Sequence, residues 1–409
     1  MSDFHQGGAV ATLHRLNPDG LRRLEHELVD VVADHPIGLV LPALYSEFET
    51  PAMHRIRAEL AQVRYLRRIV VALDRASEAQ YEAAEDFFYR FPTPVTILWI
   101  DGPPMQALLE MLEQRGLSPG PNGKGRACWL AFGYALACGD CEIFALHDCD
   151  IVNYERQLLG RLCYPVANPN LGFEFSKGYY ARVTDRMNGR VTRLFVTPLV
   201  RSLQGMAGPA PFLDFLSSFR YPLAGEFAMK TNLARVNRIP ADWGLEIGAL
   251  AEVFRNCATS RVCQVDIADN YEHKHQILSA DDAGKGLRRM ALDIAKCLFR
   301  TMAGEGLVFT RDHFCSLEVR YIRLAEDSIN RYYADAQLNG LQFDRHAEEE
   351  AVATFANSLR QAAKEFCTSP LGSLQIPSWN RVTSAIPDFL HQLVGAVAST
   401  SRSAMVGAA

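Results

Sequence analysis

The sequence predicts an α/β fold built on a mostly parallel sheet, followed by a helical C-terminal region. Short apolar runs alternate with helical patterns as far as Asp150, and several of these runs end at an aspartate. Beyond about residue 280, apolar positions recur at helical spacing between Gly and Pro breaks. Alternation of this kind is typical of a doubly wound sheet, whose ligands bind at the carboxyl ends of the strands.

The elements of the first part follow in the order strand, helix, strand. The strands are predicted at 38–44, 69–74, 96–101 and 142–146, and the helices between the later strands at 78–88, 105–115 and 127–137. The strands end near Tyr45, Asp74, Asp101 and Asp148. Because the carboxyl ends of parallel strands lie at one edge of a sheet, we expect these residues to share a rim.

The fourth strand delivers two carboxylates, Asp148 and Asp150, separated by one residue. Mg²⁺ prefers oxygen ligands and is usually bound by one or two carboxylates together with substrate phosphates. The pair therefore suggests a divalent-cation site for nucleotide diphosphate chemistry. The alternative is that a strand-end aspartate serves only as a cap or turn residue.

A glycine-rich turn, Gly123-Lys124-Gly125-Arg126, leads into the helix predicted at 127–137. Free backbone N–H groups and the positive end of the helix dipole, with two cations beside them, suit a phosphate. The spacing of a Walker A loop is absent. An ordinary solvated loop is the alternative interpretation.

Residues 173–195 form a local basic cluster in a chain of formal net charge -5. Only Glu174 and Asp185 oppose its cations, which are Lys177, Arg182, Arg186, Arg190 and Arg193. Arginine suits bidentate binding of carboxylate and phosphate, so the cluster points to an anionic ligand; a solvated ion-paired face is the alternative. Asn188-Gly189 favours a turn, so a hairpin or loop is expected here rather than a helix.

Length and composition favour one large catalytic domain with an appendage. The chain has 409 residues, 48% of them hydrophobic, and no apolar run long enough to cross a membrane. Residues 1–15 lack the apolar core of a signal peptide, and the ten cysteines are scattered, so a reduced cytoplasmic location is expected. A lone Cys138-x-x-Cys141 argues against structural zinc, and the acidic balance argues against nucleic acid as a partner.

The C-terminal region carries helical periodicity over 286–302, 315–336, 346–366 and 378–397, without a chemical motif. We expect it to pack on the catalytic domain or to form a homodimer contact. The predicted divisions are a helical N-terminal extension (1–35), a catalytic domain (36–280), the helical region (281–400) and a disordered tail (401–409).

Taken in order, short motifs between about residues 36 and 280 resemble the retaining GT-A glycosyltransferases called glucosyl-3-phosphoglycerate synthases. The motifs are Leu41-Pro42-Ala43-Leu44, Gly123-Lys124-Gly125, Asp148-Cys149-Asp150, Gly189-Arg190-Val191-Thr192, Pro222-Leu223-Ala224-Gly225-Glu226, Asp242-Trp243-Gly244-Leu245-Glu246-Ile247-Gly248 and Glu272-His273. The resemblance implies a GT-A fold, which is a Rossmann-like nucleotide-sugar-binding domain, with the nucleotide-sugar half extending to about residue 155 and the acceptor half after it. It also implies transfer of glucose from UDP-glucose to the 2-hydroxyl of 3-phosphoglycerate, with retention.

The resemblance also implies roles for particular residues. Donor-binding positions are Pro42, Ala43, Leu44, Tyr45, Asp74, Lys124 and Asp148, and acceptor-binding positions are Gly189, Arg190 and Thr192. Asp148, Asp150 and His273 match the ligands of Mg²⁺ or Mn²⁺, with Asp150 the direct ligand. Glu226 matches a glutamate near the donor glucose and, with Asp150, is expected to be catalytic; Asp242 and Glu246 are further candidates for sugar contact, and Glu246 could instead brace its helix.

The chain departs from the family pattern at three places. Tyr45-Ser46-Glu47 stands where Asn-Glu-Glu is common, Arg75-Ala76 replaces a Ser-rich continuation, and Lys274-His275 follows His273 in place of Arg-Asn. His35 and His275 compete with His273 as ligands, without a motif to support them. The alternatives in function are a mannosyl-3-phosphoglycerate synthase using GDP-mannose, a sugar-phosphate nucleotidyltransferase, and a non-catalytic nucleotide-sugar sensor.

Overall fold

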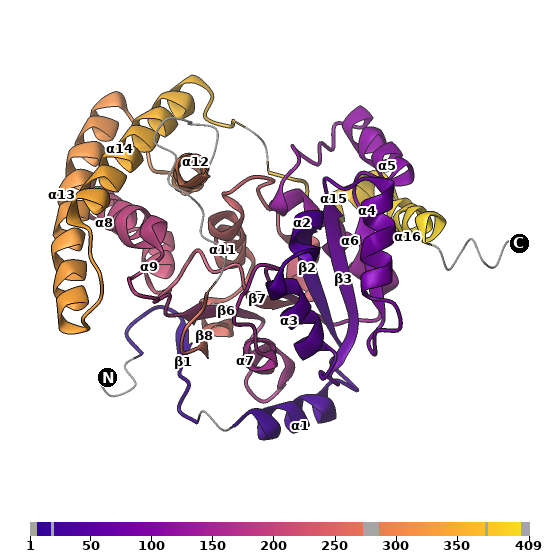
Figure 1. Cartoon of the computed structure of the whole chain (residues 1–409). Coiled ribbons are helices and arrows are strands. Elements are labelled where there is room, and N and C mark those ends of the chain that lie inside the picture. The colour runs from indigo at the N-terminus through magenta and orange to yellow at the C-terminus, as the bar shows by residue number, and fades with distance from the viewer. Residues whose placement is uncertain (1–5, 18–19, 273–285, 373–374, 402–409) are drawn as a thin grey trace, which may run out of the picture.

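The computed structural model describes residues 6–17, 20–272, 286–372 and 375–401, and its centre is one sheet (Figure 1). Among these residues the sheet has eight strands in the order β1-β8-β6-β7-β5-β2-β3-β4. The strands are β1 (Ala11–Leu13), β2 (Ile37–Leu44), β3 (Leu66–Asp74), β4 (Val95–Trp99), β5 (Ile143–Leu146), β6 (Phe175–Tyr180), β7 (Phe227–Lys230) and β8 (Val262–Ala268). Of these eight, only β7 runs antiparallel to its neighbours, so the prediction of a mostly parallel sheet is confirmed.

Both faces of the sheet are buried, and successive side chains of a strand enter different cores. On β2, Val40 belongs to one apolar core, whereas Leu39 and Leu41 belong to the other. The second core is covered by α1 (Leu21–Val31), α2 (Tyr45–Phe48), α3 (Pro51–Leu60), α4 (Glu78–Phe87) and α7 (Arg156–Ala167). The first is covered by α5 (Pro103–Gln114), α6 (Lys124–Cys138), α8 (Thr197–Ala207), α9 (Pro211–Ser217), α10 (Thr231–Val236) and α11 (Leu245–Asn256), and a 3₁₀ turn η2 (Thr259–Arg261) precedes β8.

The register of the parallel strands brings their carboxyl ends together, as predicted. Leu44 at the end of β2 lies opposite Asp74 at the end of β3. The chain leaves β5 beside β2, where His147 N–H donates to the Val40 carbonyl at 3.2 Å. The segment that carries Asp148 and Asp150 therefore starts beside the middle of β2, four residues before the strand ends at Leu44.

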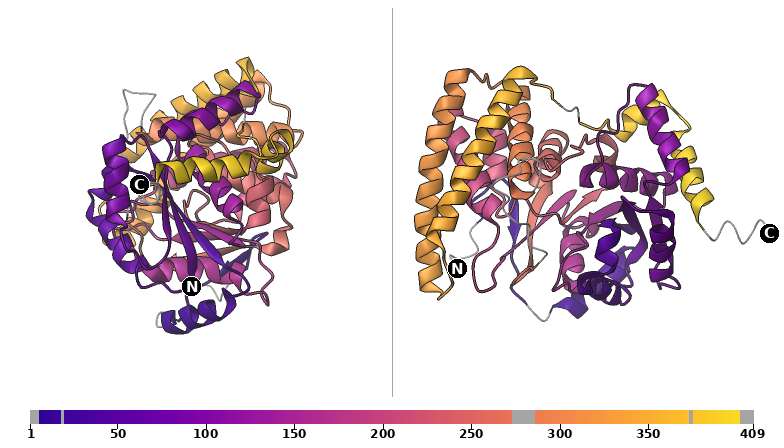
Figure 2. Two further views of the ribbon diagram at one scale, coloured as in Figure 1. Left: turned by 90° about the vertical axis from the view of Figure 1, so that its right-hand side faces the viewer. Right: turned by 45° about the horizontal axis from the view of Figure 1, so that its top comes forward.

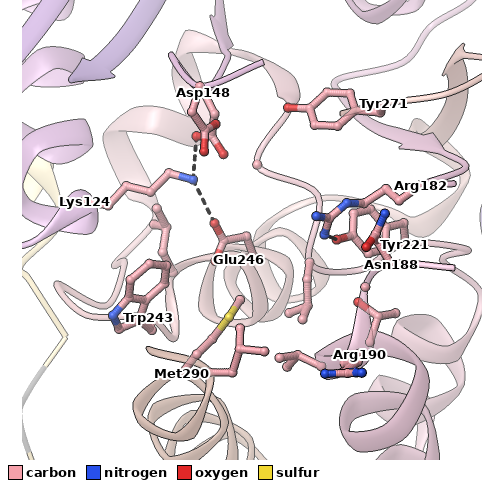
Figure 3. Close-up of a pocket in the computed structure, with 18 of the residues that line it drawn as sticks. Lys124, Asp148, Arg182, Asn188, Arg190, Tyr221, Trp243, Glu246, Tyr271 and Met290 are labelled. Atoms are coloured by element: carbon pink, nitrogen blue, oxygen red, sulfur yellow. Dashed lines mark hydrogen bonds and ion pairs between the residues drawn. The ribbon is translucent and has the colours of Figure 1, made fainter. Parts of the chain in front are cut away.

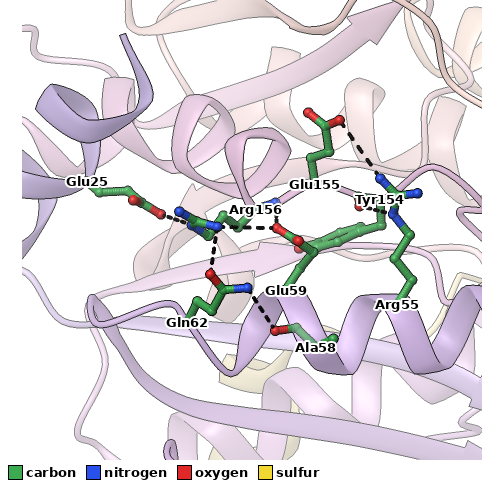
Figure 4. A network of polar contacts seen from close by, with 8 residues as sticks. All are labelled: Glu25, Arg55, Ala58, Glu59, Gln62, Tyr154, Glu155 and Arg156. Carbon is green, nitrogen blue, oxygen red and sulfur yellow. Dashed lines mark hydrogen bonds and ion pairs between the residues drawn. The ribbon is translucent and has the colours of Figure 1, made fainter. Parts of the chain in front are cut away.

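The N-terminal stretch contains a strand as well as the expected helix. β1 pairs in parallel with β8 and forms one edge of the sheet, and α1 follows it. Polar contacts tie α1 and α3 to the start of α7, where the Arg156 side chain donates to Glu25 at 2.8 Å and the Arg156 backbone N–H donates to Glu59 at 3.1 Å (Figure 4). Among the described residues of this stretch, β1 is thus part of the sheet and α1 packs beside α7.

The C-terminal region splits into two parts that pack at opposite ends of the molecule (Figures 1 and 2). The first part is α12 (Gly286–Gly304), α13 (Arg311–Leu338) and α14 (Arg345–Thr368), which lie beside α8. The second part is α15 (Trp379–Ala385) and α16 (Phe389–Thr400), which return to α5 and α6. The predicted helix at 378–397 is broken at Ile386, because a residue before proline avoids helical dihedrals.

A stacked pair of tryptophans fastens this returning segment. The rings of Trp129 on α6 and Trp379 on α15 lie 4.0 Å apart, and each indole N–H donates to a backbone carbonyl of the other segment. A Cβ at Gly133 would lie 2.0 Å from the Trp379 ring, so this glycine permits the close approach. The last helices are therefore built into the nucleotide half.

The basic segment adopts a hairpin-like loop only in its first part. Val183 and Met187 form an antiparallel bridge, and Gly189 has a positive φ of 77°, as the predicted turn requires. The chain then enters a π-helix, η1 (Val191–Val196), which continues into α8. The expectation of a loop is therefore wrong for Thr192 and Arg193, because η1 is buried under the C-terminal helices and its side chains pack there.

The domain divisions stay predictions, and the tail from residue 402 lies outside the described residues. Within the described ranges, no helix combines the length and hydropathy needed to cross a bilayer.

Candidate active site

A cavity of about 970 Å³ lies at the carboxyl edge of the sheet, where the predicted rim was expected (Figure 3). Its wall on one side is formed by the ends of β2 and β3, the N-terminus of α6 and residues 148–150. The opposite wall is formed by residues 180–193 and by the start of α14. The cavity therefore joins the nucleotide half to the basic segment.

Lys124 lies in the first turn of α6, directly after the N-cap Gly123. Its ammonium group is 2.7 Å from Asp148 Oδ1 and 3.1 Å from Glu246 Oε1 (Figure 3). Burial opposes its charge, but Asp148 and Glu246 outweigh burial and hold the pKa of Lys124 well above its usual value. The glycine-rich turn thus presents a permanent cation and a helix N-terminus to the cavity.

Three carboxylates crowd the same wall, namely Glu47, Asp148 and Asp150. Burial, and then the charge of Asp148, raises the pKa of Asp150 to about 7. Burial, and then Asp150, raises the pKa of Glu47 to about 7. Gly225 lies so close to Asp148 that a Cβ there would be 2.4 Å from Oδ2.

These oxygen donors suit a hard divalent cation, because a cation offsets the burial and the mutual repulsion that raise both pKa values. Within the described residues, no set of three His, Cys, Asp or Glu side chains is arranged to hold a metal. The predicted ligand His273 lies outside the described residues. Its neighbour Glu272 is described, and the Val152 N–H donates to the Glu272 carbonyl at 2.7 Å.

Glu226 is fully buried and is not among the residues that line the cavity. Its carboxylate accepts hydrogen bonds from the hydroxyls of Tyr180, at 2.8 Å, and Tyr271. The two tyrosine rings are stacked 3.8 Å apart, and both residues do line the cavity. Burial, reinforced by Asp148, raises the pKa of Glu226. Its geometry fits a residue that holds the tyrosine pair.

Arg190 and Thr192 both face the cavity, as predicted. Arg190 Nε donates to Glu348 on α14 at 2.7 Å. The buried Thr192 hydroxyl has no hydrogen-bond partner among the described residues, which leaves it available to a ligand. Gly189 also lines this wall.

Arg182 supplies a second cation on this wall. It donates to the Tyr221 hydroxyl at 3.0 Å, and its buried Nε has no partner in the described part of the chain (Figure 3). Neighbouring tyrosines raise the pKa of Arg182 although burial opposes its charge. An arginine whose partner is a neutral phenol can still bind an anion.

Most of the other predicted residues also reach the cavity. The remaining lining positions from the sequence are Pro42, Ala43, Leu44, Asp74, Asp242 and Glu246. Asp242 also accepts the Gly244 N–H at 2.9 Å. Tyr45, like Glu226, is absent from the lining, and its ring stacks on Phe48.

Several lining residues were not predicted from the sequence. Glu47 follows the Leu41-Pro42-Ala43-Leu44 motif and Tyr271 precedes Glu272-His273, so their positions beside these motifs could have indicated them. Tyr180 lies within the basic segment 173–195, and Tyr221 directly precedes the motif that ends at Glu226. Glu348 has no such signal, because it lies in a long amphipathic helix far along the chain.

No protein-family model matches the chain, but individual proteins do. It is 47% identical to the glucosyl-3-phosphoglycerate synthase of Persephonella marina over 397 residues, covering 97% of this chain and 98% of that protein. It is 38% identical to the enzyme of that name from Methanococcoides burtonii, covering 96% of both chains.

Solved structures show the same fold at low sequence identity. A glucosyl-3-phosphoglycerate synthase from Mycobacterium tuberculosis, in complex with phosphoglyceric acid, matches with a TM-score of 0.52 and 21% identity over 74% of this chain and 90% of that chain. The mannosyl-3-phosphoglycerate synthase of Rubrobacter xylanophilus matches with a TM-score of 0.53 and 22% identity over 73% and 83%. These likenesses confirm the GT-A fold, and the near full-length identity to the two curated relatives establishes that the chain belongs to the glucosyl-3-phosphoglycerate synthase family.

Proposed function

We propose that this protein is a metal-dependent retaining glycosyltransferase that moves glucose from UDP-glucose to the 2-hydroxyl of 3-phosphoglycerate. The main support for this proposal is a cavity with carboxylates and Lys124 on one wall and arginines on the other. A nucleotide sugar and an anionic acceptor would each meet a wall of suitable chemistry. Membership of the family supports this choice, and a relative of the same name has been solved with Mn²⁺, UDP-glucose and phosphoglyceric acid.

On the donor side, Pro42, Ala43 and Leu44 would contact the nucleoside with their backbone and apolar surface. The buried Asp74 Oδ1 has no partner among the described residues, so it could accept an N–H from the base. Lys124 and the N-terminus of α6 would face the diphosphate.

Asp150, Asp148 and His273 would hold Mg²⁺ or Mn²⁺, with Asp150 as direct ligand. The metal, when bound, supplies positive charge to the diphosphate as the glycosidic bond breaks. Support comes from the buried, crowded carboxylates and from Glu272, which brings the chain beside Val152 immediately before His273. Lys124 would exchange contacts with Asp148 for contacts with a phosphate oxygen.

On the acceptor side, Arg190, Gly189 and Thr192 would bind the phosphate of 3-phosphoglycerate, and Arg182 would bind its carboxylate. Arg190 is held by Glu348 through Nε alone, so its two terminal nitrogens can form a bidentate pair with phosphate oxygens. Thr192 could donate the hydroxyl hydrogen that lacks a partner among the described residues.

Glu226 would act by positioning and not as a nucleophile. Both carboxylate oxygens accept tyrosine hydroxyls, and the group lies behind the cavity lining. The proton of the acceptor hydroxyl would then pass to the leaving diphosphate on the same face, which accounts for retention without a protein nucleophile.

The test is incubation of the protein with Mg²⁺, 3-phosphoglycerate and either UDP-glucose or GDP-mannose, read out by released nucleotide and product mass. We expect a glucosylated phosphoglycerate only with UDP-glucose. Transfer from GDP-mannose instead would show a mannosyltransferase. Release of pyrophosphate in a parallel incubation with a nucleoside triphosphate and a sugar phosphate would show a nucleotidyltransferase.

We also propose a cytoplasmic homodimer. All ten cysteines are free thiols, which suits a reducing compartment. Light scattering on the purified full chain measures the oligomeric state directly, and a monomer at micromolar concentration would overturn the dimer.

A further inference from the structure

A buried carboxylate on a C-terminal helix faces two arginines of the basic segment. Glu348 lies in the first turn of α14, and only 4% of its surface is exposed. Its Oε1 accepts Arg190 Nε at 2.7 Å and Arg193 Nη2 at 3.4 Å, and its Oε2 accepts Arg193 Nη1 at 2.9 Å. The N-terminal end of a helix favours a carboxylate, so this charge is stabilised where it is buried.

The two arginines differ in how many of their nitrogens are bound by the protein. Arg193 is 9% exposed and is fully engaged, because it also donates to the Asn188 carbonyl at 3.0 Å and to the Met187 carbonyl at 3.2 Å. Its guanidinium lies 4.8 Å from the centre of the Tyr332 ring on α13. Arg193 therefore fastens the loop that precedes Gly189 to the C-terminal helices.

Arg190 keeps its terminal nitrogens for a ligand. Only its Nε is bound to Glu348, and its side chain is 31% exposed on the cavity wall. An anchored Nε fixes the plane of the guanidinium and the direction in which the two remaining nitrogens point. The triad of Arg190, Arg193 and Glu348 has a net charge of about +1, so it remains attractive to a phosphate.

The segment that carries Arg190 and Arg193 is itself held by the C-terminal region. Arg190 is the N-cap of η1, and Arg193 lies within it. η1 is a π-helix, an irregular form that is often found at functional sites. The Tyr321 hydroxyl on α13 donates to the Leu194 carbonyl of η1 at 2.9 Å, within the buried core. Two helices thus grip the segment that presents Arg190 and Thr192.

We propose that Glu348 is a positioning residue for the acceptor phosphate, through which the C-terminal helices complete the acceptor site. This inference rests on the proposed function, in which Arg190 binds the phosphate. Glu348 orients the guanidinium of Arg190 directly and the Gly189 turn through Arg193. The C-terminal region is therefore part of the substrate site.

The test compares Glu348→Gln with the wild type and with Glu349→Gln. Glutamine keeps the size but removes the negative charge and replaces one acceptor oxygen by an NH2 donor, which cannot accept from a guanidinium group. Glu349 is the matched control, because it lies one residue further on α14 and forms an exposed pair with Arg345 at 3.0 Å. Calorimetry on the full chain measures the Kd of 3-phosphoglycerate and of inorganic phosphate, and kinetics measure both KM values and kcat.

We expect Glu348→Gln to weaken binding of both phosphate ligands and to raise the acceptor KM by about 10- to 100-fold, the size of a lost charge-assisted contact. The UDP-glucose KM should stay within about twofold, and Glu348→Asp should recover part of the loss. Glu349→Gln should behave as wild type. If Glu348→Gln unfolds the protein, Glu348→Asp and Arg193→Lys provide the same comparison, provided that each variant has the thermal midpoint of the wild type.

The outcomes separate this inference from the proposed function. A wild type that binds phosphate but does not glucosylate 3-phosphoglycerate contradicts the function, while the change in phosphate Kd still decides the role of Glu348. Unchanged phosphate binding in Glu348→Gln overturns the inference, as does an equal loss of donor and acceptor affinity. A wild type that binds neither phosphate ligand also overturns it.

Discussion

The two walls of the cavity differ in charge and in the way the chain builds them. The donor wall is crowded with carboxylates that follow the neighbouring parallel strands β2 and β5, and Lys124 lies between Asp148 and Glu246 of α11. The acceptor wall is cationic, and its arginines are held by tyrosines and by a glutamate from α14. The first wall follows from sheet topology, whereas the second depends on contacts between distant parts of the chain.

This difference explains why only one substrate needs a metal. A diphosphate that approaches Glu47, Asp148 and Asp150 meets charges of its own sign, and one lysine does not offset them. A divalent cation offsets the negative charge that the lysine leaves on that wall. A phosphate that approaches Arg182 and Arg190 meets complementary charge directly.

The largest expected effect is on the donor wall. Asp150→Ala should lower kcat by about 10³-fold or more, since the charge stabilisation from a bound metal amounts to several kcal/mol. Steady-state assays with saturating substrates and Mg²⁺ measure this, and circular dichroism confirms that the fold is intact. EDTA should abolish wild-type turnover, and added Mg²⁺ should restore it.

The control for this variant is Glu110→Ala, which removes an exposed carboxylate on α5 outside the cavity. It should retain full activity. Turnover in EDTA equal to that with Mg²⁺ would show that the carboxylates of the donor wall do not act by binding a metal. The explanation of the difference between the two walls would then be wrong.

A smaller effect, confined to the other substrate, is expected from Arg190→Ala. Loss of a charge-assisted pair costs about 1.5 to 3 kcal/mol, so the KM for 3-phosphoglycerate should rise roughly 10- to 100-fold. The KM for UDP-glucose should hardly change, because the donor wall contains none of the groups that bind Arg190. Initial-rate matrices in both substrates separate the two constants.

Arg201→Ala, at an exposed position on α8, is the charge-matched control and should behave as wild type. An equal rise in both KM values for Arg190→Ala would place this arginine at the junction of the substrates. D-glycerate should be a poor acceptor for the wild type, and equal use of glycerate and 3-phosphoglycerate would show that the basic segment is only a solvated face.

The donor wall could be predicted from the sequence because its signals are local. The apolar runs that end at Asp74 and Asp148 each deliver a residue to the cavity, and parallel pairing aligns the ends of β2 and β3, as Leu44 and Asp74 show. The glycine-rich turn likewise precedes its helix directly, so Lys124 was placed correctly. Tyr45 does not line the cavity, because α2 begins at this residue and its ring packs on Phe48.

The acceptor wall was only half predictable. The arginines and the turn at Gly189 are visible in the sequence, but their partner Glu348 is 158 residues beyond Arg190 and lies in a helix without a motif. The π-helix has no local signature, since it forms where the C-terminal helices enclose Val191–Val196. β1 was missed for a similar reason, because three residues carry no periodicity and only pairing with β8 makes them a strand.

The smallest effect distinguishes the walls by their response to pH. Burial and mutual repulsion raise the pKa values of Asp150 and Glu47 to about 7, which favours their protonated forms in the metal-free protein. Their contribution to folding stability is therefore present below about pH 4 and is lost as the pH rises through 7. A bound cation needs the carboxylate form, so Mg²⁺ affinity should fall as the pH drops below 7, by about tenfold per unit for each proton displaced.

Calorimetric titration of Mg²⁺ between pH 5.5 and 8.5, in buffers of different ionisation enthalpy, measures both the affinity and the protons released. The guanidinium groups of the acceptor wall stay charged throughout this range, so binding of 3-phosphoglycerate should change only near the second pKa of its own phosphate, at about 6. If Mg²⁺ affinity does not vary between pH 6 and 8, Asp150 is already ionised in the free protein. The donor wall would then keep its negative charge throughout this pH range, and the two walls would not differ in their response to pH.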